Sequence, residues 1–376
     1  MTQAAPTPAP GPRYTRLVAE LPASVPFVGP EAQERAAGRP FRARLGANEN
    51  GFGPSPRAIA AMAEAAAGAW MYGDSLSHDL RNALAAHHGC APENVIVGEG
   101  IDGLLGNLVR LVVAPGDRVV TSAGAYPTFN YHVAGFGGEL VCVPYRGDAE
   151  DPQALIARAA AADAKLVYIS NPDNPMASHH GPQVILDMLA AVPPGCVMVL
   201  DEAYIEFAPD GTAPAIDPDD PRVIRMRTFS KGYGLAGARV GYALGAPGLI
   251  AAFDKIRNHF GMSRVSQAGA LAALHDQDWL AATCAKVARA RARIEAIAAE
   301  NGLGALPSAT NFVAIDCGGD GALATRVLHE LAARAIFVRK PSVAPQDRCI
   351  RVSCGPDAEL DALAEALPDA LAAARG

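Results

Sequence analysis

The sequence predicts an α/β protein whose main domain holds a largely parallel sheet. From residue 41 onward, apolar runs with strand character alternate with helical patterns, and this alternation is typical of successive βα units. The seven runs expected as strands are residues 94–97, 117–121, 139–143, 165–170, 196–201, 222–228 and 238–244. Helices are expected between them at residues 101–113, 128–136, 151–162, 181–191 and 247–258. We therefore expect a seven-stranded, mainly parallel sheet between helices.

The pattern changes at both ends of this region, and a chain of 376 residues is long enough for two domains. Residues 1–40 are expected to form a disordered, proline-rich lead and an arm. After residue 262 a long alanine- and arginine-rich helix (277–301) is expected, followed by two short strands and two helices. The expected parts are the arm (1–40), a large domain (41–262) and a C-terminal part (263–376), which forms a smaller α+β domain together with the arm.

The composition narrows the class of partner. A net charge of −7 disfavours a nucleic-acid surface, since such surfaces are basic. No run approaches the roughly 18 apolar residues that a spanning helix needs, and the N-terminus shows no signal leader. The seven cysteines form no CxxC pair, and we expect free thiols in a reducing compartment. No HExxH or similar spacing suggests a metal site. We expect a cytoplasmic protein without metal, nucleic-acid or membrane partners.

One stretch of mostly small residues, TFSKGYGLAGARVG at 228–241, contains both a lysine and an arginine. Most lysines are solvated surface groups, so Lys231 alone means little. However, Thr228 and Ser230 flank it with hydroxyls, and Arg239 follows eight residues later. In addition, Asp201 closes an apolar strand thirty residues earlier. Together these residues are typical of the lysine centre of a pyridoxal-phosphate enzyme.

Each residue type suits that chemistry. Lys231 would hold the cofactor aldehyde as an imine and act as general base, because burial lowers the pKa of an amine. Asp201 would keep the pyridine nitrogen protonated, which makes the ring an electron sink. Tyr204, three residues further on, would reach the ring oxygen. Hydrogen bonds to the phosphate would come from Arg239, Ser230 and Thr228.

The same stretch also contains GxGxxG, a dinucleotide-binding fingerprint, at Gly232, Gly234 and Gly237. That fingerprint requires a helix after it and an acidic residue about 20 positions later. Here RVGYAL follows Gly237 as a strand pattern, and residues 251–254 provide no matching strand end. The dinucleotide interpretation is therefore disfavoured.

The lysine stretch is one of an ordered series of motifs. The series is RLGANENGFGPSP (44–56), a tyrosine followed by DLRNAL (72–84), APENVIVGEGID (91–102), YPTF (126–129), NPDNP (171–175), VLDEAY (199–204), SKGYGLAGARVGY (230–242), ATNF (309–312) and IRVSCG (350–355). In order and spacing it resembles the fold-type I pyridoxal-phosphate aminotransferases, and most of all the histidinol-phosphate aminotransferase family. The resemblance implies the fold-type I architecture, pyridoxal 5'-phosphate as cofactor and a homodimer with shared active sites.

The glycines after the first strand are expected to form the cup for the cofactor phosphate. Helix N-termini beyond the carboxyl ends of parallel strands bind phosphate, so backbone amides near Gly100, Ile101 and Asp102 are expected there. A glycine turn with an ordinary helix cap at Asp102 is the alternative. Relatives carry a glutamate where Gly103 stands here, but backbone amides still serve.

The resemblance also assigns residues around the cofactor ring and the substrate. Phe129 matches the aromatic that stacks on the ring, with a core phenylalanine as the alternative reading. Asn174 would donate to the ring oxygen, although NPDNP also suits a pair of Asx-Pro turns. Tyr72 would reach the phosphate in the partner subunit. The substrate would be bound by Arg351 at its carboxylate, by Arg339 at its distal group, and by Asn48.

The expected reaction moves an amino group between histidinol phosphate or an aromatic amino acid and a 2-oxo acid such as 2-oxoglutarate, with ping-pong kinetics. Relatives that act on histidinol phosphate carry an N-terminal tyrosine where SVPFVGPE places Phe27, so one phosphate hydrogen bond is lost. Two alternatives stay open. One is a decarboxylase of the same fold, similar to threonine-phosphate decarboxylase, and the other is a non-catalytic regulatory domain that binds the cofactor.

Overall fold

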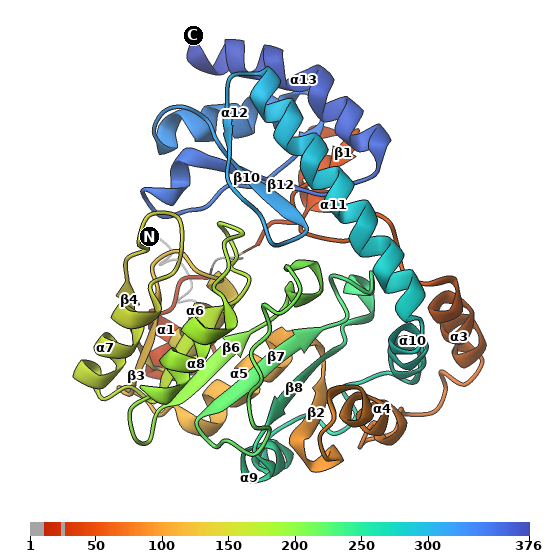
Figure 1. The fold of residues 1–376 in the computed structure, drawn as a ribbon, viewed down its shortest axis with the longest axis vertical. Helices are drawn as coiled ribbons and strands as arrows, with labels where there is room; N and C mark the ends of the chain where they lie inside the picture. Colours follow the sequence, from red (N-terminus) through yellow and green to blue (C-terminus); the bar gives the residue numbers. More distant parts are fainter. Residues whose placement is uncertain (1–10, 24–26) are drawn as a thin grey trace, which may run out of the picture.

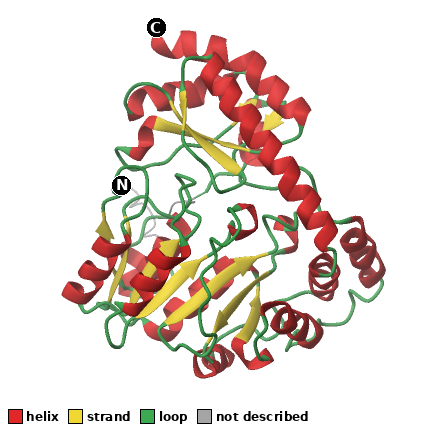
Figure 2. Cartoon of the chain, viewed as in Figure 1, coloured by secondary structure: helices red, strands yellow, loops and turns green. Residues whose placement is uncertain are grey.

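The chain forms a large domain built on a sheet and a smaller domain above it in Figure 1. The computed structural model describes residues 11–23 and 27–376, so most of the expected disordered lead, residues 1–10, lies outside the described residues. The long helix α11 (Gln277–Glu300) runs between the two domains. Figure 2 shows the large sheet as a layer between helices, and the predicted α/β class is confirmed.

The main sheet has seven strands in the order β2-β8-β7-β6-β5-β3-β4. They are β2 (Val95–Gly98), β3 (Arg118–Ser122), β4 (Glu139–Val143), β5 (Leu166–Ser170), β6 (Val197–Asp201), β7 (Val223–Thr228) and β8 (Gly241–Gly245). β8 is antiparallel to both of its neighbours, whereas the pairs from β7 to β4 are parallel. The chain returns from β7 to β8 through residues 229–240 without a crossover helix, which an antiparallel pair permits. That return segment contains Lys231.

Helices cover both faces of the sheet. They are α5 (Gly100–Val112), α6 (Pro127–Gly135), α7 (Pro152–Ala162), α8 (Pro182–Ala190) and α9 (Pro247–Ala252). Alternate strand residues pack on opposite faces: Tyr168 and Val199 pack with residues of α5 and α6, while Val167 and Leu200 pack with residues of α7 and α8. Burial on both faces explains why the strands read as nearly continuous apolar runs. The helix expected at 247–258 ends at Ala252 and continues as a short 3₁₀ turn.

Three helices that the sequence pattern did not predict pack together beside β2 and β8. They are α3 (Pro56–Ala66), α4 (His78–His88) and α10 (Arg264–Leu274). Ala270 and Leu274 of α10 share one buried cluster with Leu84 of α4 and Val95 of β2. Helix α10 therefore packs against the helices and the strand at this edge of the main sheet.

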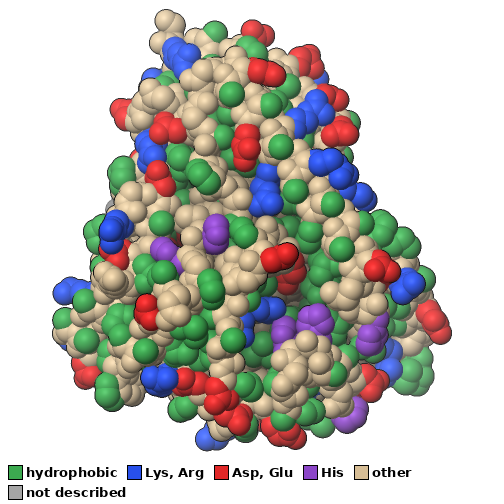
Figure 3. Space-filling view, viewed as in Figure 1, with side chains coloured by type: hydrophobic (Ala, Val, Ile, Leu, Met, Phe, Trp, Pro, Cys, Tyr) green, Lys and Arg blue, Asp and Glu red, His purple; other side chains and the backbone are tan. Residues whose placement is uncertain are grey.

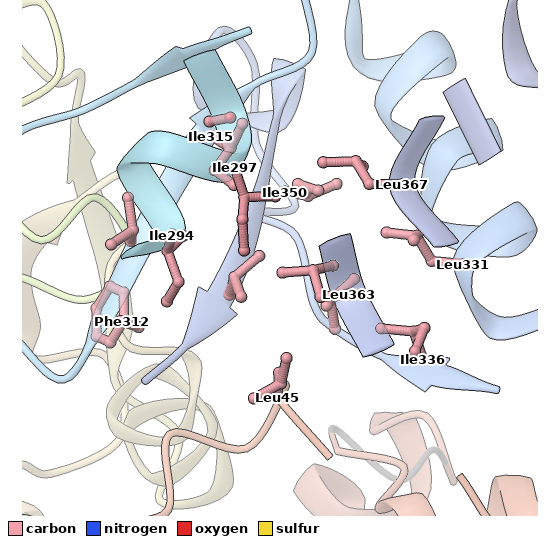
Figure 4. Close-up of a cluster of buried hydrophobic side chains, with 14 of the residues drawn as sticks. Leu45, Ile294, Ile297, Phe312, Ile315, Leu331, Ile336, Ile350, Leu363 and Leu367 are labelled. Carbon is pink, nitrogen blue, oxygen red and sulfur yellow. The ribbon is translucent and has the colours of Figure 1, made fainter. Parts of the chain in front are cut away.

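The small domain combines the two ends of the chain. β1 (Ala43–Arg44) pairs in parallel with β11 (Ile336–Phe337), and β12 (Cys349–Ser353), β10 (Phe312–Asp316) and β9 (Gly304–Ala305) form an antiparallel sheet. Helices α12 (Gly321–Ala333) and α13 (Asp357–Arg375) pack on these strands. Figure 4 shows Leu45, from the N-terminal side, reaching the cluster that contains Ile350 and Leu363. Two short helices, α1 (Arg16–Glu20) and α2 (Pro30–Ala37), precede β1, and Glu31 and Glu34 of α2 pair with Arg44.

On the face seen in Figure 3, acidic and basic side chains are intermixed over both domains. Within residues 11–23 and 27–376, no helix has the length and apolarity needed to cross a bilayer. In the same described ranges, no three His, Cys, Asp or Glu side chains gather in a way that could hold a metal ion.

Candidate active site

Lys231 lies on the return segment just beyond the carboxyl end of β7, where α/β sheets place their ligand sites. Its Nζ donates a 2.9 Å hydrogen bond to the backbone oxygen of Asn48 and lies 5.5 Å from the ring centre of Tyr204. Burial, and secondly the charge of Arg351, lowers the pKa of Lys231 to about 8. About a tenth of this amine is therefore uncharged at pH 7, far more than for an ordinary lysine, and the uncharged amine is the form that acts as nucleophile or base.

Asp201 is the last residue of β6 and is buried. Its Oδ2 accepts a 2.6 Å hydrogen bond from the hydroxyl of Tyr168, and its Oδ1 accepts a 2.9 Å bond from the backbone N–H of Ala203. Burial raises the pKa of Asp201 to about 6, and these two hydrogen bonds work against that rise. Asp201 is therefore a buried carboxylate at neutral pH without a cationic partner in the described part of the chain.

Tyr204 brings together three segments that are distant in the sequence. Its hydroxyl accepts a 3.1 Å hydrogen bond from Nδ2 of Asn48 and a 3.4 Å bond from Nδ2 of Asn174. Its ring meets Phe312 edge-on, with centroids 5.3 Å apart. Burial raises the pKa of Tyr204 to about 12, so the phenol stays protonated. Tyr204, Asn48, Asn174 and Lys231 thus line one site, as the sequence series had suggested.

Arg351, on β12 of the small domain, faces the same site. Its Nη1 donates to Oδ1 of Asn174, and its guanidinium lies 5.2 Å from the ring centre of Phe312. No carboxylate pairs with it among the described residues, and its buried Nε has no hydrogen-bond partner there. Burial, acting first, lowers the pKa of Arg351 to about 10, which still leaves it charged at neutral pH. A buried guanidinium with an unused donor is suited to an incoming carboxylate.

An anion-binding arrangement forms where α5 begins. Gly100 is the first residue of α5 and has a φ of +76°, and a Cβ there would lie only 2.5 Å from Nη2 of Arg239. A Cβ on Gly241 would lie 2.6 Å from the backbone nitrogen of Ile101. These two glycines therefore let the guanidinium and β8 approach the helix N-terminus, where backbone N–H groups favour anions.

The remaining residues expected at the phosphate lie around this helix start. Asp102 is in the first turn of α5 and accepts a 2.9 Å hydrogen bond from the hydroxyl of Tyr126. Arg239 is exposed, has a left-handed backbone with φ of 55°, and donates from Nη1 to the oxygen of Ala236 at 3.0 Å. Thr228 and Ser230 are buried, and Thr228 Oγ1 accepts from the N–H of Ser230 at 3.0 Å. The hydroxyl of Thr228 also donates to the oxygen of Val240 at 3.3 Å, so it braces the return segment.

The resemblance assigned Phe129 to the cofactor ring, and the structure places its side chain in the core. Phe129 is 0% exposed and stacks on Tyr168 in the core, with centroids 4.5 Å apart and planes 18° apart. It lies inside α6, which begins at Pro127, whereas Tyr126 precedes the helix at the end of the loop after β3. Tyr126 is partly buried and its hydroxyl reaches Asp102. Tyr126 is therefore a second candidate for the aromatic beside the cofactor ring, and its place after a parallel strand is the sequence signal for it.

Two predicted residues lie at the edge of this arrangement. Arg339 pairs through its backbone with Arg351, donates from Nη1 to the oxygen of Val28 at 3.1 Å, and has Phe27 4.2 Å from its guanidinium. Tyr72 is 77% exposed and its ring packs at a tilt against Phe260, with centroids 4.9 Å apart, and no described hydrogen bond joins it to the Lys231 site of its own chain. The structure therefore does not bring Tyr72 together with the other predicted residues.

Several polar residues of the site were not singled out from the sequence. Asn311 donates from Nδ2 to the oxygen of Asn48 at 3.1 Å, and the hydroxyl of Ser353 donates to Oδ1 of Asn48 at 3.1 Å. These contacts hold Asn48 in a left-handed backbone conformation with φ of 55°. Both residues sit in the motifs ATNF and IRVSCG, which were noted only as fragments of the series.

A partly buried lysine and a buried aspartate, both at the carboxyl edge of this sheet and under a small α+β domain, define a fold-type I pyridoxal-phosphate enzyme. Comparison with known proteins gives the family. The chain matches the aminotransferase class I and II family over residues 43–367, and it belongs to that family. It is an aminotransferase, and neither a decarboxylase nor a regulatory domain is favoured.

Individual relatives carry two different names. The chain is 38% identical over 307 residues to a histidinol-phosphate aminotransferase of Anaeromyxobacter sp., which covers 80% of this chain and 84% of that one. It is also 38% identical over 302 residues to an aromatic amino acid aminotransferase of Corynebacterium diphtheriae, covering 79% of this chain and 86% of that one. The crystal structure of histidinol-phosphate aminotransferase from Sinorhizobium meliloti in complex with pyridoxal-5'-phosphate superposes with a TM-score of 0.93 at 54% identity, over 97% of this chain and 99% of that one.

Proposed function

We propose that this aminotransferase binds pyridoxal phosphate at Lys231 and moves an amino group between histidinol phosphate and a 2-oxo acid such as 2-oxoglutarate. The observation that carries the proposal is the gathering of Lys231, Asp201, Asn174 and Arg351 at one site without a carboxylate partner for Arg351. The solved relative from Sinorhizobium meliloti, which contains the cofactor, supports the same conclusion.

The residues present fit the cofactor at both of its charged ends. Glycines at 100 and 241 leave the start of α5 open to Arg239, which suits a phosphate. Asp201 is a buried carboxylate without a cation, which suits a protonated ring nitrogen. When bound, the cofactor supplies an aldehyde that captures amines and a ring that withdraws electrons from the substrate Cα.

The chain's own groups have distinct tasks in the proposed reaction. Lys231 tethers the cofactor and then, as a free amine with lowered pKa, takes the proton from the substrate Cα. Asp201 keeps a proton on the ring nitrogen. Asn174 and Tyr204 donate to the ring oxygen, and Tyr126 covers the ring in place of Phe129. The phosphate is held by the backbone near Gly100, Ile101 and Asp102 with Arg239, Ser230 and Thr228.

On the substrate side, Arg351 binds the carboxylate of the 2-oxo acid through the donors that the protein leaves unused. Arg339, on the neighbouring strand segment, holds the distal acidic group, and Asn48 contacts the substrate from the arm side. Burial lowers the pKa of Arg339, and its Nη1 donates to the backbone oxygen of Val28, which is a neutral acceptor. An anionic group of the substrate would therefore stabilise the charged guanidinium of Arg339.

The second candidate donor is an aromatic amino acid, and one observation favours it: the ring of Phe27 lies over the guanidinium of Arg339. A tyrosine there would offer a hydroxyl to phosphate, worth about 1.5–3 kcal/mol or roughly 10–150-fold in affinity. Phe27→Tyr should therefore raise kcat/KM for histidinol phosphate by about tenfold or more, without changing it for phenylalanine. Specificity constants of wild type and Phe27→Tyr with both donors test this. If the kcat/KM of wild type for histidinol phosphate is about tenfold or more below that for phenylalanine or tyrosine, an aromatic amino acid replaces histidinol phosphate as the assigned donor.

The enzyme is further proposed to be a homodimer in the cytoplasm. Trp70, Tyr72, Leu76 and Phe260 are large apolar side chains that this chain leaves exposed, and such a patch suits a second copy. Tyr72 would reach the partner's phosphate from this patch. All seven cysteines are free thiols, which suits a reducing compartment.

Mixing Tyr72→Phe with Lys231→Ala tests the shared site. Each homodimer carries a lesion in both of its sites, whereas a mixed dimer has one site with Lys231 and Tyr72 both intact. Random exchange should give on the order of a quarter of wild-type activity, because half of the dimers are mixed and each has one intact site. Activity no higher than the sum of the two separate variants, after exchange is verified by mass, would contradict a shared site.

A further inference from the structure

A chain of buried hydroxyls lies beneath Asp201 and has no role in the description above. Tyr168, on β5, donates its hydroxyl hydrogen to Oδ2 of Asp201 at 2.6 Å. The same phenolic oxygen accepts a 3.1 Å hydrogen bond from the hydroxyl of Ser170. Tyr168 is 0% exposed, and Phe129 stacks on its ring. The phenol is thus fixed from two sides and cannot exchange its carboxylate partner for water.

The polar network continues from Ser170 toward the loop that carries Asn174. The backbone N–H of Ser170 donates to Oε1 of Glu150 at 2.9 Å, and the hydroxyl of Ser122 donates to Oε2 at 2.5 Å. Glu150 and Asp173 are both buried; burial raises the pKa of each carboxyl, and the charge of Asp173 raises the pKa of Glu150 further. Because Asp173 directly precedes Asn174, buried polar side chains connect the site of the ring nitrogen with that of the ring oxygen.

The chemistry at Asp201 explains what a donor on its carboxylate would do. A buried carboxylate and a pyridine nitrogen compete for one proton, and burial raises the proton affinity of the carboxylate. The groups that face Asp201 include Asp102 from α5 and the adjacent Glu202, and the negative charges of both raise the proton affinity of Asp201 further. Two hydrogen-bond donors lower the proton affinity of Asp201: the hydroxyl of Tyr168 and the N–H of Ala203. Of these two, only the hydroxyl belongs to a side chain, and it is the shorter bond.

We propose that Tyr168 is a positioning residue of the reaction: its hydroxyl, oriented by Phe129 and Ser170, keeps Asp201 ionised so that the shared proton stays on the cofactor's ring nitrogen. The proposal rests on the role of Asp201 in the proposed function. Tyr168 itself touches neither cofactor nor substrate. Since hydrogen bonds in a chain polarise one another, Ser170 strengthens the bond that Tyr168 donates.

The direct test is the nitrogen-15 chemical shift of pyridoxal phosphate labelled at its ring nitrogen and bound to the protein, followed across neutral pH. Wild type should show a protonated ring nitrogen. Tyr168→Phe should move the signal toward the unprotonated form, with the ratio of the two forms changed about tenfold or more, and kcat should fall in proportion while KM changes less. Tyr242→Phe is the matched control. Tyr242 is also buried on this sheet, but its hydroxyl is hydrogen-bonded to His88 of α4 at 2.9 Å and not to Asp201. It should match wild type.

An unchanged nitrogen signal in folded Tyr168→Phe overturns the proposal. If Tyr168→Phe does not fold, Ser170→Ala replaces it, because that variant removes only the donor to the phenol and should shift the signal in the same direction by less. A Ser170→Ala signal identical to wild type then overturns the proposal as well. Failure of the underlying function would look different: borohydride would not label Lys231 in wild type, or Asp201→Asn would leave the wild-type nitrogen signal unchanged.

Discussion

Replacing Lys231 with alanine is expected to reduce turnover by about 10⁴-fold or more, because one amine serves as both tether and general base. The variant should still fold and bind pyridoxal phosphate reversibly, since the groups around the phosphate remain. Borohydride reduction followed by peptide mapping should label Lys231 in wild type and leave the variant unlabelled.

Lys255→Ala is a suitable control for that experiment, because Lys255 is an exposed lysine of the same domain. It should retain both activity and borohydride labelling at Lys231. A label on any lysine other than Lys231 in wild type would mean that the buried amine described above is not the cofactor's anchor.

The sequence predicted those parts of the site that follow from the periodicity of the sheet. Asp201 and Thr228 end adjacent parallel strands, and the carboxyl ends of such strands meet at one edge. Lys231 follows directly on the short return to β8. Asn48 and Arg351 reach the same site from the two ends of the chain, and no strand pattern predicts that meeting. Asn48 and Arg351 were predicted from the resemblance of the motif series to a known family, and not from any pattern of strands and helices.

The differences between the expected and the observed elements have local physical causes. Phe129 and Tyr126 are three residues apart in YPTF, and only the exact start of α6 decides which of them faces the sheet edge. Helix starts are the least certain feature of any pattern, because end residues make few of the helix's hydrogen bonds. In α3, alanine stands at buried and exposed positions alike, as at Ala58 and Ala60, so residue type alone hardly marks its buried face. No residue of α10 is exposed, so its sequence shows no solvent-facing polar stripe.

Tyr168 shows a different limit of sequence reasoning. It lies in LVYIS, a run that predicts a buried strand, and the strand is confirmed. Buried tyrosines in such strands usually serve packing, with the hydroxyl satisfied wherever a partner exists. That its partner is Asp201 depends on the register of β5 against β6, where Ser170 pairs with Asp201. Register across parallel strands joined by a helix is not encoded in either strand alone.

Asp201→Asn is expected to abolish most turnover and yet to stabilise the cofactor-free protein at neutral pH. Burial raises the pKa of Asp201 in the folded state to about 6 from an ordinary value of 3.8. Well below pH 3.8 the carboxyl is protonated in both folded and unfolded chains, so it has no pH-dependent effect on stability there. As pH rises toward 6, the unfolded chain ionises first and stability falls, reaching a loss of about 3 kcal/mol above the folded pKa. The neutral amide escapes this loss but cannot hold a proton on the ring nitrogen.

The two effects of Asp201→Asn can be separated by experiment. Denaturant unfolding of the cofactor-free protein should give a variant up to about 3 kcal/mol more stable than wild type at pH 8, with the difference shrinking as pH falls and reaching zero only well below pH 3.8. Turnover should fall by about 10²-fold or more at every pH, since the electron-withdrawing power of the ring depends on that proton. Glu202→Gln provides the contrast: its carboxylate pairs with Arg225 at 2.8 Å and Arg227 at 2.9 Å, so its loss strands two buried cations and should destabilise the fold. An Asp201→Asn protein that loses stability at pH 8, or that keeps wild-type turnover, would show that the carboxylate belongs to the scaffold and not to the chemistry.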